Sequence, residues 1–181
     1  MQRYSNSAYW AGSYGHASKG LWPHEFEVQK GTVLYRFIDI SKAPSVIGAD
    51  GPWWFEFDHY QQIKGFAQQH GYALGYCARI FAAILYEWSE VNAVVRAEVI
   101  DGPLKVWKGK GKQVEAKGTD TRDVAVQHGV LTSSVPQVSR KMTPMQGRLE
   151  VLQLFIPGLG KPYQKFGSFM KLLGSEQIQS G

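Results

Sequence analysis

Cysteine is almost absent from the chain, since Cys77 is the only one among 181 residues. A lone thiol forms no intramolecular disulfide and builds no cysteine-based metal cluster. Cys77 lies in the apolar segment 76–81, which predicts a buried helix and therefore a structural thiol rather than a nucleophile. We accordingly expect a chain that folds in a reducing environment.

Long apolar runs are missing as well. No stretch reaches the roughly 20 apolar residues that a transmembrane helix needs. Residues 1–6 lack the apolar centre of a signal peptide. We therefore expect no membrane span, and either a cytoplasmic location or delivery into a target cell by a machine that needs no cleavable signal.

Several catalytic and metal-binding motifs are absent too. The five histidines include no pair at i, i+4 spacing and no His-Glu-x-x-His pattern, so we expect no metal site. The nucleophile pattern Gly-x-Ser-x-Gly does not occur. The basic, glycine-containing segment 108–112 does not complete a phosphate-binding Walker loop, because no Gly-Lys-Ser/Thr follows at the required spacing.

The composition that remains is globular and rich in aromatic residues. Apolar residues make up 44% and charged residues 19%, a balance that predicts one domain with a substantial core. Aromatic residues reach 13%, which fits either an aromatic core or exposed rings in a binding cleft. The net charge of +5 favours anionic partners, such as nucleic acid, a nucleotide phosphate or an acidic protein.

The predicted elements follow an α+β pattern in a single domain. Strands are predicted over 26–28, 32–38, 53–57, 92–100, 104–108 and 149–156, and helices over 59–70 and 74–88. The turn at Gly102-Pro103 predicts that the strands on either side of it pair as a hairpin, with 108–112 as a basic loop. Because the helices do not alternate with every strand, a doubly wound α/β sheet is excluded.

The chain divides into three parts. Residues 1–24 are predicted as an irregular arm, residues 25–159 as the catalytic-type domain, and residues 160–181 as a short amphipathic piece with a frayed tail. Four aromatic residues of the arm are expected to wrap on the body of the domain: Tyr9, Trp10, Tyr14 and Trp22.

Arg36 is the first candidate site residue. It shares one face of its predicted strand with Leu34 and Ile38, because strand residues alternate between faces. On such an apolar face the guanidinium either reaches past the edge to water or is partly buried and grips a phosphate. Both interpretations stay open on the sequence.

The stretch 51–67 is the second candidate. Its order predicts a turn, a short aromatic strand and a helix that Asp58 begins as N-cap. The adjacent Trp53 and Trp54 point to opposite faces of that strand, so one enters the core while the other lines a groove.

Three short motifs lie in order within residues 31–156: Leu34-Tyr35-Arg36, Gly51-Pro52-Trp53-Trp54 continued by Tyr60 and Phe66, and Leu149-Glu150-Val151-Leu152; a further partial match, Thr132-Ser133-Ser134, departs from the pattern because it lies only 16 residues before Glu150. They resemble the ADP-ribosyltransferase superfamily. That family has an Arg or His on an early strand, a glycine–aromatic strand before a helix, a Ser-Thr-Ser strand in one branch, and a Glu that opens a late strand. The resemblance implies split β-sheets with two helices inserted after the second strand.

The resemblance also implies the site residues. Glu150 is implied as the catalytic carboxylate, which would stabilise the positive charge that builds on the ribose when the nicotinamide–ribose bond of NAD breaks. Arg36 would hold the ribose or diphosphate through charge-assisted hydrogen bonds, and aromatic rings would stack on the nicotinamide. The implied NAD-binding residues are Arg36, Tyr35, Trp53, Trp54, Tyr60, Phe66 and Ser133.

The implied activity is transfer of ADP-ribose, or hydrolysis of NAD, by a bacterial toxin or effector domain, with NAD as substrate. The arginine-specific branch has Glu or Gln two residues before its catalytic Glu, whereas this chain has Arg148. The acceptor therefore stays open between a protein and a nucleic acid. An immunity or inhibitor protein is a further implied partner.

Two other functions fit the same residues. A nucleic-acid-binding module would use the net charge of +5, the segment 108–112 and the aromatic surplus to track phosphates and stack bases. A metal-independent ribonuclease toxin would use His59 or His128 as acid or base.

Overall fold

Seven antiparallel strands form the main sheet of the protein in the computed structural model, and three two-residue strands form a second, small sheet. The structure describes residues 3–42, 49–82, 84, 89–111, 114–115, 137–138, 141–142, 151–160 and 163–180. Helices and an antiparallel sheet in one domain make the fold α+β, as predicted.

The elements have these bounds. The strands are β1 (Leu21–Val28), β2 (Val33–Ile38), β3 (Trp53–Glu56), β4 (Ala93–Val99), β5 (Leu104–Gly111), β6 (Val114–Glu115), β7 (Gln137–Val138), β8 (Lys141–Met142), β9 (Gln153–Phe155) and β10 (Met170–Gln177). The helices are the short 3₁₀ helix η1 (Ser7–Tyr9), α1 (Ser13–Ala17), α2 (Phe57–His70), α3 (Leu74–Ala82) and α5 (Phe166–Phe169).

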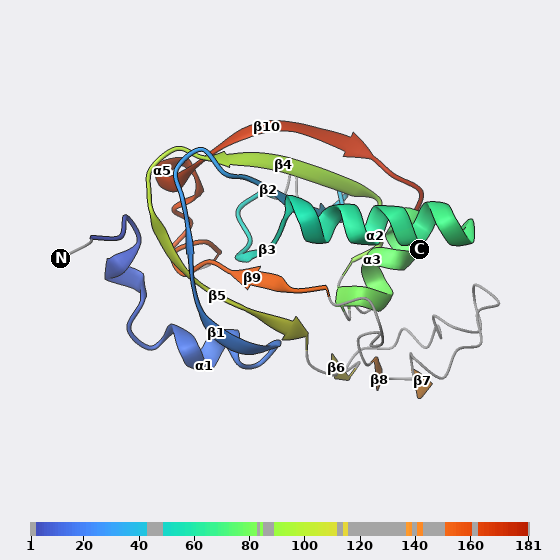
Figure 1. Ribbon diagram of the computed structural model, residues 1–181, viewed down its shortest axis with the longest axis horizontal. Helices are drawn as coiled ribbons and strands as arrows, with labels where there is room; N and C mark the ends of the chain where they lie inside the picture. The colour runs from blue at the N-terminus through green and yellow to red at the C-terminus, as the bar shows by residue number, and fades with distance from the viewer. Residues whose placement is uncertain are drawn as a thin grey trace.

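Strand β3 joins two halves of the main sheet. Its residues Trp53 and Trp54 pair with β9, whereas Phe55 and Glu56 pair with β2. The strand order is therefore β1-β5-β9-β3-β2-β4-β10, with three strands on either side of β3 (Figure 1). We call the point between Trp54 and Phe55, where β3 changes partner, the seam.

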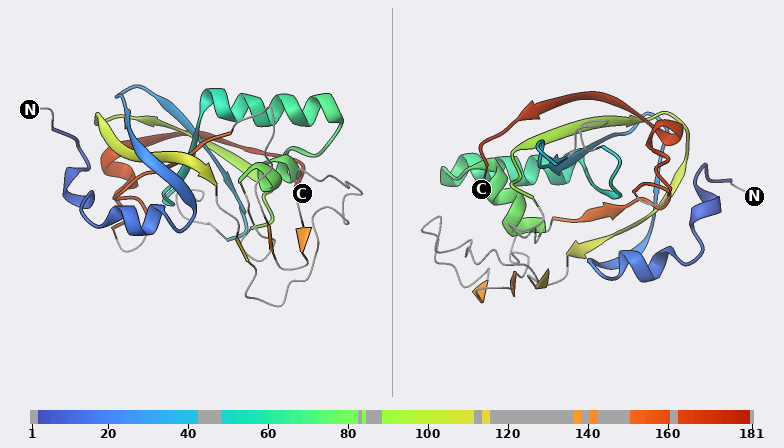
Figure 2. Two further views of the ribbon diagram at one scale, coloured as in Figure 1. Left: turned by 60° about the horizontal axis from the view of Figure 1, so that its bottom comes forward. Right: turned by 180° about the vertical axis from the view of Figure 1, so that it is seen from behind.

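Different segments cover the two halves of the sheet. Helices α2 and α3 pack against β2 and β3 through a buried cluster that includes Phe37, Phe55, Tyr60 and Ile63. The N-terminal arm lies beside β1 and β5, away from these helices (Figures 1 and 2). A second buried cluster draws residues from both halves, among them Leu34, Trp54, Val95, Leu104 and Leu154.

The two helices follow the third strand rather than the second, which corrects the predicted insertion point. The strand that precedes β2 is β1, which starts at Leu21 instead of Phe26 and counts as a strand of the main sheet because it pairs with β5 along its whole length. Pro23 lies inside this strand. It is tolerated because β1 is an edge strand with β5 as its only neighbour in the main sheet, so a missing N–H can face outward.

The predicted hairpin around Gly102-Pro103 is wrong. Strand β4 pairs with β2 and β10, whereas β5 pairs with β1 and β9, so the turn carries the chain from one half of the sheet to the other. Leu104 and Val106 of β5 are fully buried in the cluster that both halves share. Burial of these side chains decides the pairing, which a local turn signal does not contain.

The basic segment 108–112 was predicted as a loop. Instead, strand β5 continues to Gly111, the last of these residues that the structure describes. Gly109 lies so close to β1 that a Cβ there would overlap the backbone carbonyl of Trp22. The glycine thus serves close packing of two strands rather than a flexible tip.

The C-terminal residues predicted to fray form the edge strand β10. It pairs with β4 from Met170↔Val99 to Gln177↔Ala93. Met170 is buried and Leu172 is partly buried, while Lys171 and Leu173 are exposed, so the strand alternates over its first residues. Without this partner the apolar strand β4 would present an open edge.

Helix α2 begins two residues earlier than predicted. Its N-cap is Glu56, which makes no side-chain capping bond, and Asp58 lies in the first turn. A carboxylate there still interacts favourably with the helix dipole. The helix ends at Gly71 with φ 70°, the left-handed conformation that favours glycine, as predicted.

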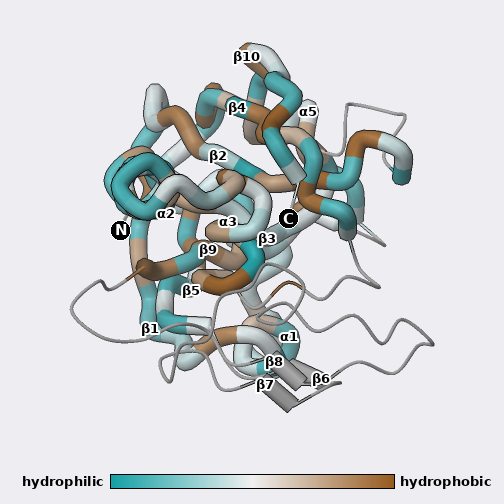
Figure 3. The backbone as a smooth tube through the Cα atoms, turned by 90° about the vertical axis from the view of Figure 1, so that its right-hand side faces the viewer, coloured by the Kyte–Doolittle hydropathy of each residue, from teal (hydrophilic) through white to brown (hydrophobic). Residues whose placement is uncertain are grey.

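Helix α3 is the buried helix of the domain. Its residues 75–81 are all buried, whereas α2 is largely hydrophilic (Figure 3). Burial raises the pKa of Cys77 in α3 to about 12, which confirms a structural thiol rather than a nucleophile. No helix within the described residues has the length and apolar character to cross a membrane.

The arm is attached to the body by polar and aromatic contacts. The fully buried Asn6 side chain donates to the carbonyls of Lys105 (2.9 Å) and Pro157 (3.0 Å) and accepts from the Lys105 N–H (2.9 Å). Trp10 stacks on Trp107 with ring centroids 4.3 Å apart. Tyr9 and Tyr14 also contact rings of the body, as predicted, whereas Trp22 is 66% exposed.

The loop after β2 is held by the buried carboxylate of Asp39. It accepts from the Ser41 N–H (3.0 Å), the Ser41 hydroxyl (2.6 Å) and the Glu90 N–H (3.1 Å). Burial acts to raise the pKa of Asp39, but the hydrogen bonds outweigh it and lower that pKa below the ordinary 3.8. The charged carboxylate therefore stabilises the fold above pH 3.8, and this contribution is lost as the pH falls through the folded pKa.

Replacing Asp39 by Asn is expected to lower the free energy of unfolding by about 1–3 kcal/mol at pH 7, because hydrogen bonds to a charged acceptor are lost. The difference from wild type should shrink as the pH falls from 3.8 through the lowered pKa of the folded protein, where the wild-type carboxylate also becomes protonated. Urea unfolding at pH 7 and again below pH 3.8 measures the difference in the free energy of unfolding between variant and wild type. The exposed Asp101→Asn is the control. A difference independent of pH would contradict the role given to the charge.

Candidate functional site

Arg36 lies at the seam of the sheet. Its Nη1 donates to the backbone carbonyl of Trp53 at 3.0 Å, and the side chain is half-buried. Gly51 makes room for it, because a Cβ at Gly51 would overlap the guanidinium. Of the two positions that the sequence left open, the structure therefore shows the partly buried one.

The Arg36 guanidinium stays positively charged at neutral pH. Burial lowers the pKa of Arg36 to about 10, and the nearby Asp50 carboxylate acts in the opposite direction. Oδ1 of Asp50 is buried and has no hydrogen-bond partner among the residues that the structure describes. A cation and an incompletely satisfied carboxylate thus lie together beside the start of β3.

Of the two tryptophans of β3, Trp54 enters the core, as predicted, and Trp53 is less buried. Trp54 is 0% exposed and donates its indole N–H to the Gly51 carbonyl at 2.8 Å. Trp53 is half-buried and packs its ring edge-on against Phe155 (4.9 Å, 68°). The prediction that Trp54 stacks on a ligand is therefore corrected, because no face of its ring reaches the surface.

The structure does not bring the other predicted aromatic residues to Arg36. Tyr35 stacks on Tyr60 at 4.3 Å, and Tyr60 is only 5% exposed. Phe66 packs edge-on against Phe81 of α3 at 5.0 Å. Tyr60 belongs to the buried cluster between α2, α3 and the sheet, and Tyr35 and Phe66 pack against it. Tyr35 also faces away from Arg36, because neighbouring residues of a strand point to opposite faces. Their positions make them part of the helix–sheet core.

Three predicted residues lie outside the described part of the chain. They are the catalytic candidate Glu150, the site candidate Ser133 and the alternative base His128. Strand β9 follows residue 150 in the sequence and lies between β3 and β5. Leu154 and Phe155 of β9 pair with the two tryptophans of β3.

Gln153 is a candidate that the sequence analysis missed. It is buried on β9, two residues before Phe155 and hence on the same face as Phe155 and its cross-strand partner Trp53. The sequence feature that could have indicated Gln153 is that it is the one amide inside the otherwise apolar run 152–156. A buried amide beside a half-buried tryptophan can orient a polar ligand by hydrogen bonds.

Lys108 is engaged in an ion pair. Its Nζ lies 2.6 Å from Oε1 of Glu56 and 4.1 Å from the centroid of the Phe26 ring. Both charged side chains are partly shielded from water, so the pair connects β5 to the end of β3. Lys108 is therefore not the free cationic rim that the segment suggested.

His59 connects α2 to the start of β9. Its Nδ1 accepts a hydrogen bond from the Leu152 N–H at 3.2 Å. Within the described ranges, no three His, Cys, Asp or Glu side chains come together as metal ligands.

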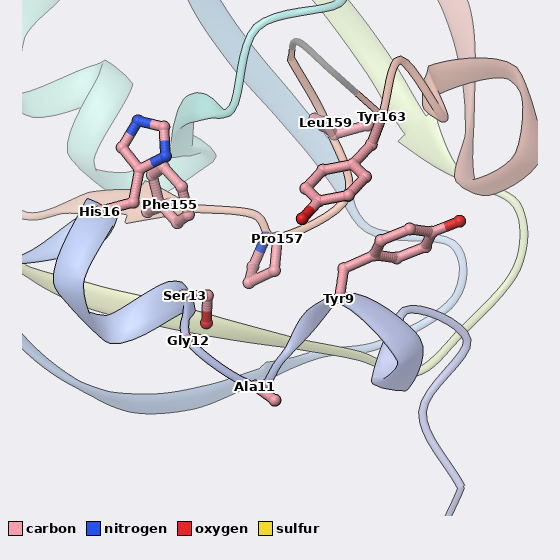
Figure 4. A pocket seen from close by; sticks show the side chains of 10 residues that line it. Tyr9, Ala11, Gly12, Ser13, His16, Phe155, Pro157, Leu159 and Tyr163 are labelled. Carbon is pink, nitrogen blue, oxygen red and sulfur yellow. The ribbon is translucent and has the colours of Figure 1, made fainter.

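A pocket of about 310 Å³ lies between the arm and the chain that follows β9 (Figure 4). It is lined by Tyr9, Ala11, Gly12, Ser13, His16, Phe155, Pro157, Gly158, Leu159 and Tyr163. Arg36, Trp53 and Gln153 are not among these described lining residues, whereas Phe155 both lines the pocket and packs against Trp53.

Comparisons with known proteins leave the family open. No model of a protein family matches the chain, and no curated protein matches it. A solved structure described as that of Tne2 in complex with Tni2 is similar, with a TM-score of 0.44 and 13% sequence identity, over 90% of this chain and 98% of that one. A likeness at this TM-score and identity does not assign the chain to a family.

Proposed function

We propose that the chain is an NAD-using enzyme that transfers ADP-ribose to a macromolecular acceptor or hydrolyses NAD, and that it acts as a toxin or effector domain. The observation that carries this proposal is the charged, half-buried Arg36 at the seam, with Gly51 making room for it. An inhibitor protein is the expected partner of such a domain in the cell that makes it.

The surroundings of Arg36 support the binding of a diphosphate. A guanidinium presents several N–H groups in a plane and pairs with phosphate oxygens through charge-assisted hydrogen bonds. The carbonyl of Trp53 orients the group, so less conformational entropy is lost when an anion binds. The charge persists at neutral pH, since the pKa of Arg36 is about 10.

The proposed reaction breaks the bond between C1′ of the ribose and the nicotinamide nitrogen of NAD. The electron pair of that bond leaves with nicotinamide, and positive charge develops on the ribose. A carboxylate beside this charge stabilises the transition state more than the ground state, which is the part proposed for Glu150. Water or an acceptor nucleophile then bonds to C1′ and loses a proton.

The aromatic part of the proposed site is smaller than the sequence suggested. Trp53 remains a candidate to contact a flat ring, because part of its surface is exposed and it lies on β3 next to β9. Gln153 lies on the same face and would bond a polar edge of that ring.

Incubation of the purified chain with NAD tests the proposal. Wild type should release nicotinamide, either alone or when cell lysate supplies an acceptor, and labelled ADP-ribose on lysate protein or nucleic acid would separate transfer from hydrolysis. If no nicotinamide appears under either condition, the proposed function is wrong. RNA binding that weakens steeply with salt, without release, would instead support the nucleic-acid-binding alternative, and RNA cleavage would support the ribonuclease.

Arg36→Lys and Gly51→Ala are expected to lower nicotinamide release by a similar factor of about 10–100, because each removes the fixed guanidinium. Lysine keeps the charge but loses the fork of N–H groups. The added Cβ of alanine displaces the guanidinium that is present. Steady-state rates over a range of NAD concentrations measure both effects.

Matched controls exist for both changes. Arg96 is an exposed arginine on β4, and Gly65 is an exposed glycine of α2 with open space around its missing Cβ. Arg96→Lys and Gly65→Ala should keep the wild-type rate. Full activity of a folded Arg36→Lys variant would remove the observation on which the proposed function rests.

A further inference from the structure

The pocket beside the N-terminal arm has the size and the walls of a small binding site. Its volume of about 310 Å³ is near the lower end of the range for ligand pockets, roughly 300–1,000 Å³. Parts of the chain far apart in sequence build it, since the arm supplies one wall and the residues after β9 supply the other. The buried Asn6 attaches the arm to the other wall, because its side chain donates to the Pro157 carbonyl.

Two pairs of rings stand on opposite sides of the pocket, with Pro157 between them (Figure 4). His16 lies over Phe155 with centroids 4.9 Å apart, and Tyr9 contacts Tyr163 at 4.8 Å. Ring faces and edges on two sides favour a flat ligand, because aromatic groups pack best on one another in offset or edge-on arrangements.

The rings also offer polar tips for recognition. The Tyr163 hydroxyl and the His16 imidazole make no hydrogen bond within the described part of the chain. Figure 4 shows the Tyr163 hydroxyl directed toward Pro157, whereas the Tyr9 hydroxyl points away from it. The Ser13 hydroxyl is already used, since it donates to the Trp10 carbonyl and accepts from the Trp107 indole. The side chains of Tyr163 and His16 can thus bond the edge of a ligand.

No Asp, Glu, Lys or Arg is found among the described residues that line this pocket. Burying an ion here would therefore cost free energy that no opposite charge offsets. The lining favours a neutral molecule with a flat ring and donor and acceptor groups at its edge.

We propose that this pocket binds a neutral, planar heteroaromatic ring with an amide or amino edge, at a site separate from Arg36. Free nicotinamide and the base of a nucleoside share this chemistry. The proposal does not depend on NAD turnover, because its evidence is the geometry and chemistry of the pocket alone.

Saturation-transfer NMR and calorimetric titration with nicotinamide and with adenosine test the proposal. At least one of the two probes should bind wild type. Tyr163→Ala and His16→Ala should each weaken that binding about five- to tenfold through the lost ring contact. Tyr163 is 50% exposed and His16 is exposed, so both variants should fold. Lys165→Ala is the control, since Lys165 is exposed nearby and does not line the pocket.

Three results would overturn the proposal. The first is the absence of binding by either probe. The second is binding that stays at wild-type strength in both pocket variants. The third is binding that disappears in Arg36→Lys while it persists in Tyr163→Ala, since this would place the probe at the seam. Binding to Arg36→Lys at wild-type strength, together with loss in Tyr163→Ala, supports the separate site.

Discussion

Replacing Trp54 by alanine is expected to lower the free energy of unfolding by about 3–5 kcal/mol, the range found when a large aromatic side chain is removed from a core. The whole side chain is buried, and its ring packs with Leu154 and Phe166 in the cluster that both halves of the sheet share. The change also leaves the Gly51 carbonyl without its indole donor. Urea unfolding followed by circular dichroism measures the loss.

Trp53→Ala is the matched comparison on the neighbouring residue. Because Trp53 is half-buried at the surface of the sheet, we expect a smaller loss of about 1–2 kcal/mol. Trp54→Phe should fall between these values, since it keeps most of the ring volume but loses the hydrogen bond. Equal destabilisation by both alanine variants would contradict the division of the two tryptophans between core and surface.

Replacing Glu150 by glutamine is expected to lower nicotinamide release by about 100- to 1,000-fold if Glu150 is the proposed carboxylate. Glutamine has nearly the same shape but no charge, so it stabilises a developing positive charge much less. The test is the rate of release at saturating NAD. Activity should fall at unchanged thermal stability.

Glu176→Gln serves as the control for this change, because Glu176 is an exposed carboxylate of β10. Its rate should equal that of wild type. If Glu150→Gln also keeps the wild-type rate, another carboxylate carries the chemistry, and Glu150 loses its proposed role while the NAD-using function can stand.

The faces of the strands and the C-terminal end of α2 were largely predictable from local sequence. Alternation placed Arg36 with Leu34, away from Tyr35, and it separated Trp53 from Trp54. Gly71 ended α2 because its backbone adopts φ 70°. Each of these outcomes depends on the geometry of a few consecutive residues, which the sequence contains.

The candidate site was predicted only in part. Arg36 and Gly51 do come together at the seam, but Tyr60 lies under α2 as part of the core. The spacing of aromatic residues along a helix is the same whether they bind a ligand or pack inside the protein. Gln153 was missed for the opposite reason, since one amide in an apolar strand has no periodic signal.

The sequence by itself determined the α+β class, the structural role of Cys77 and the charged residue on β2. The tertiary structure alone decided that β4 and β5 belong to different halves of the sheet, that residues 170–177 form its edge, and that Lys108 pairs with Glu56. Strand partners are chosen by burial and hydrogen bonding between residues far apart in the chain. Local periodicity does not contain that information. The same long-range pairing of strands also decides where Arg36 lies.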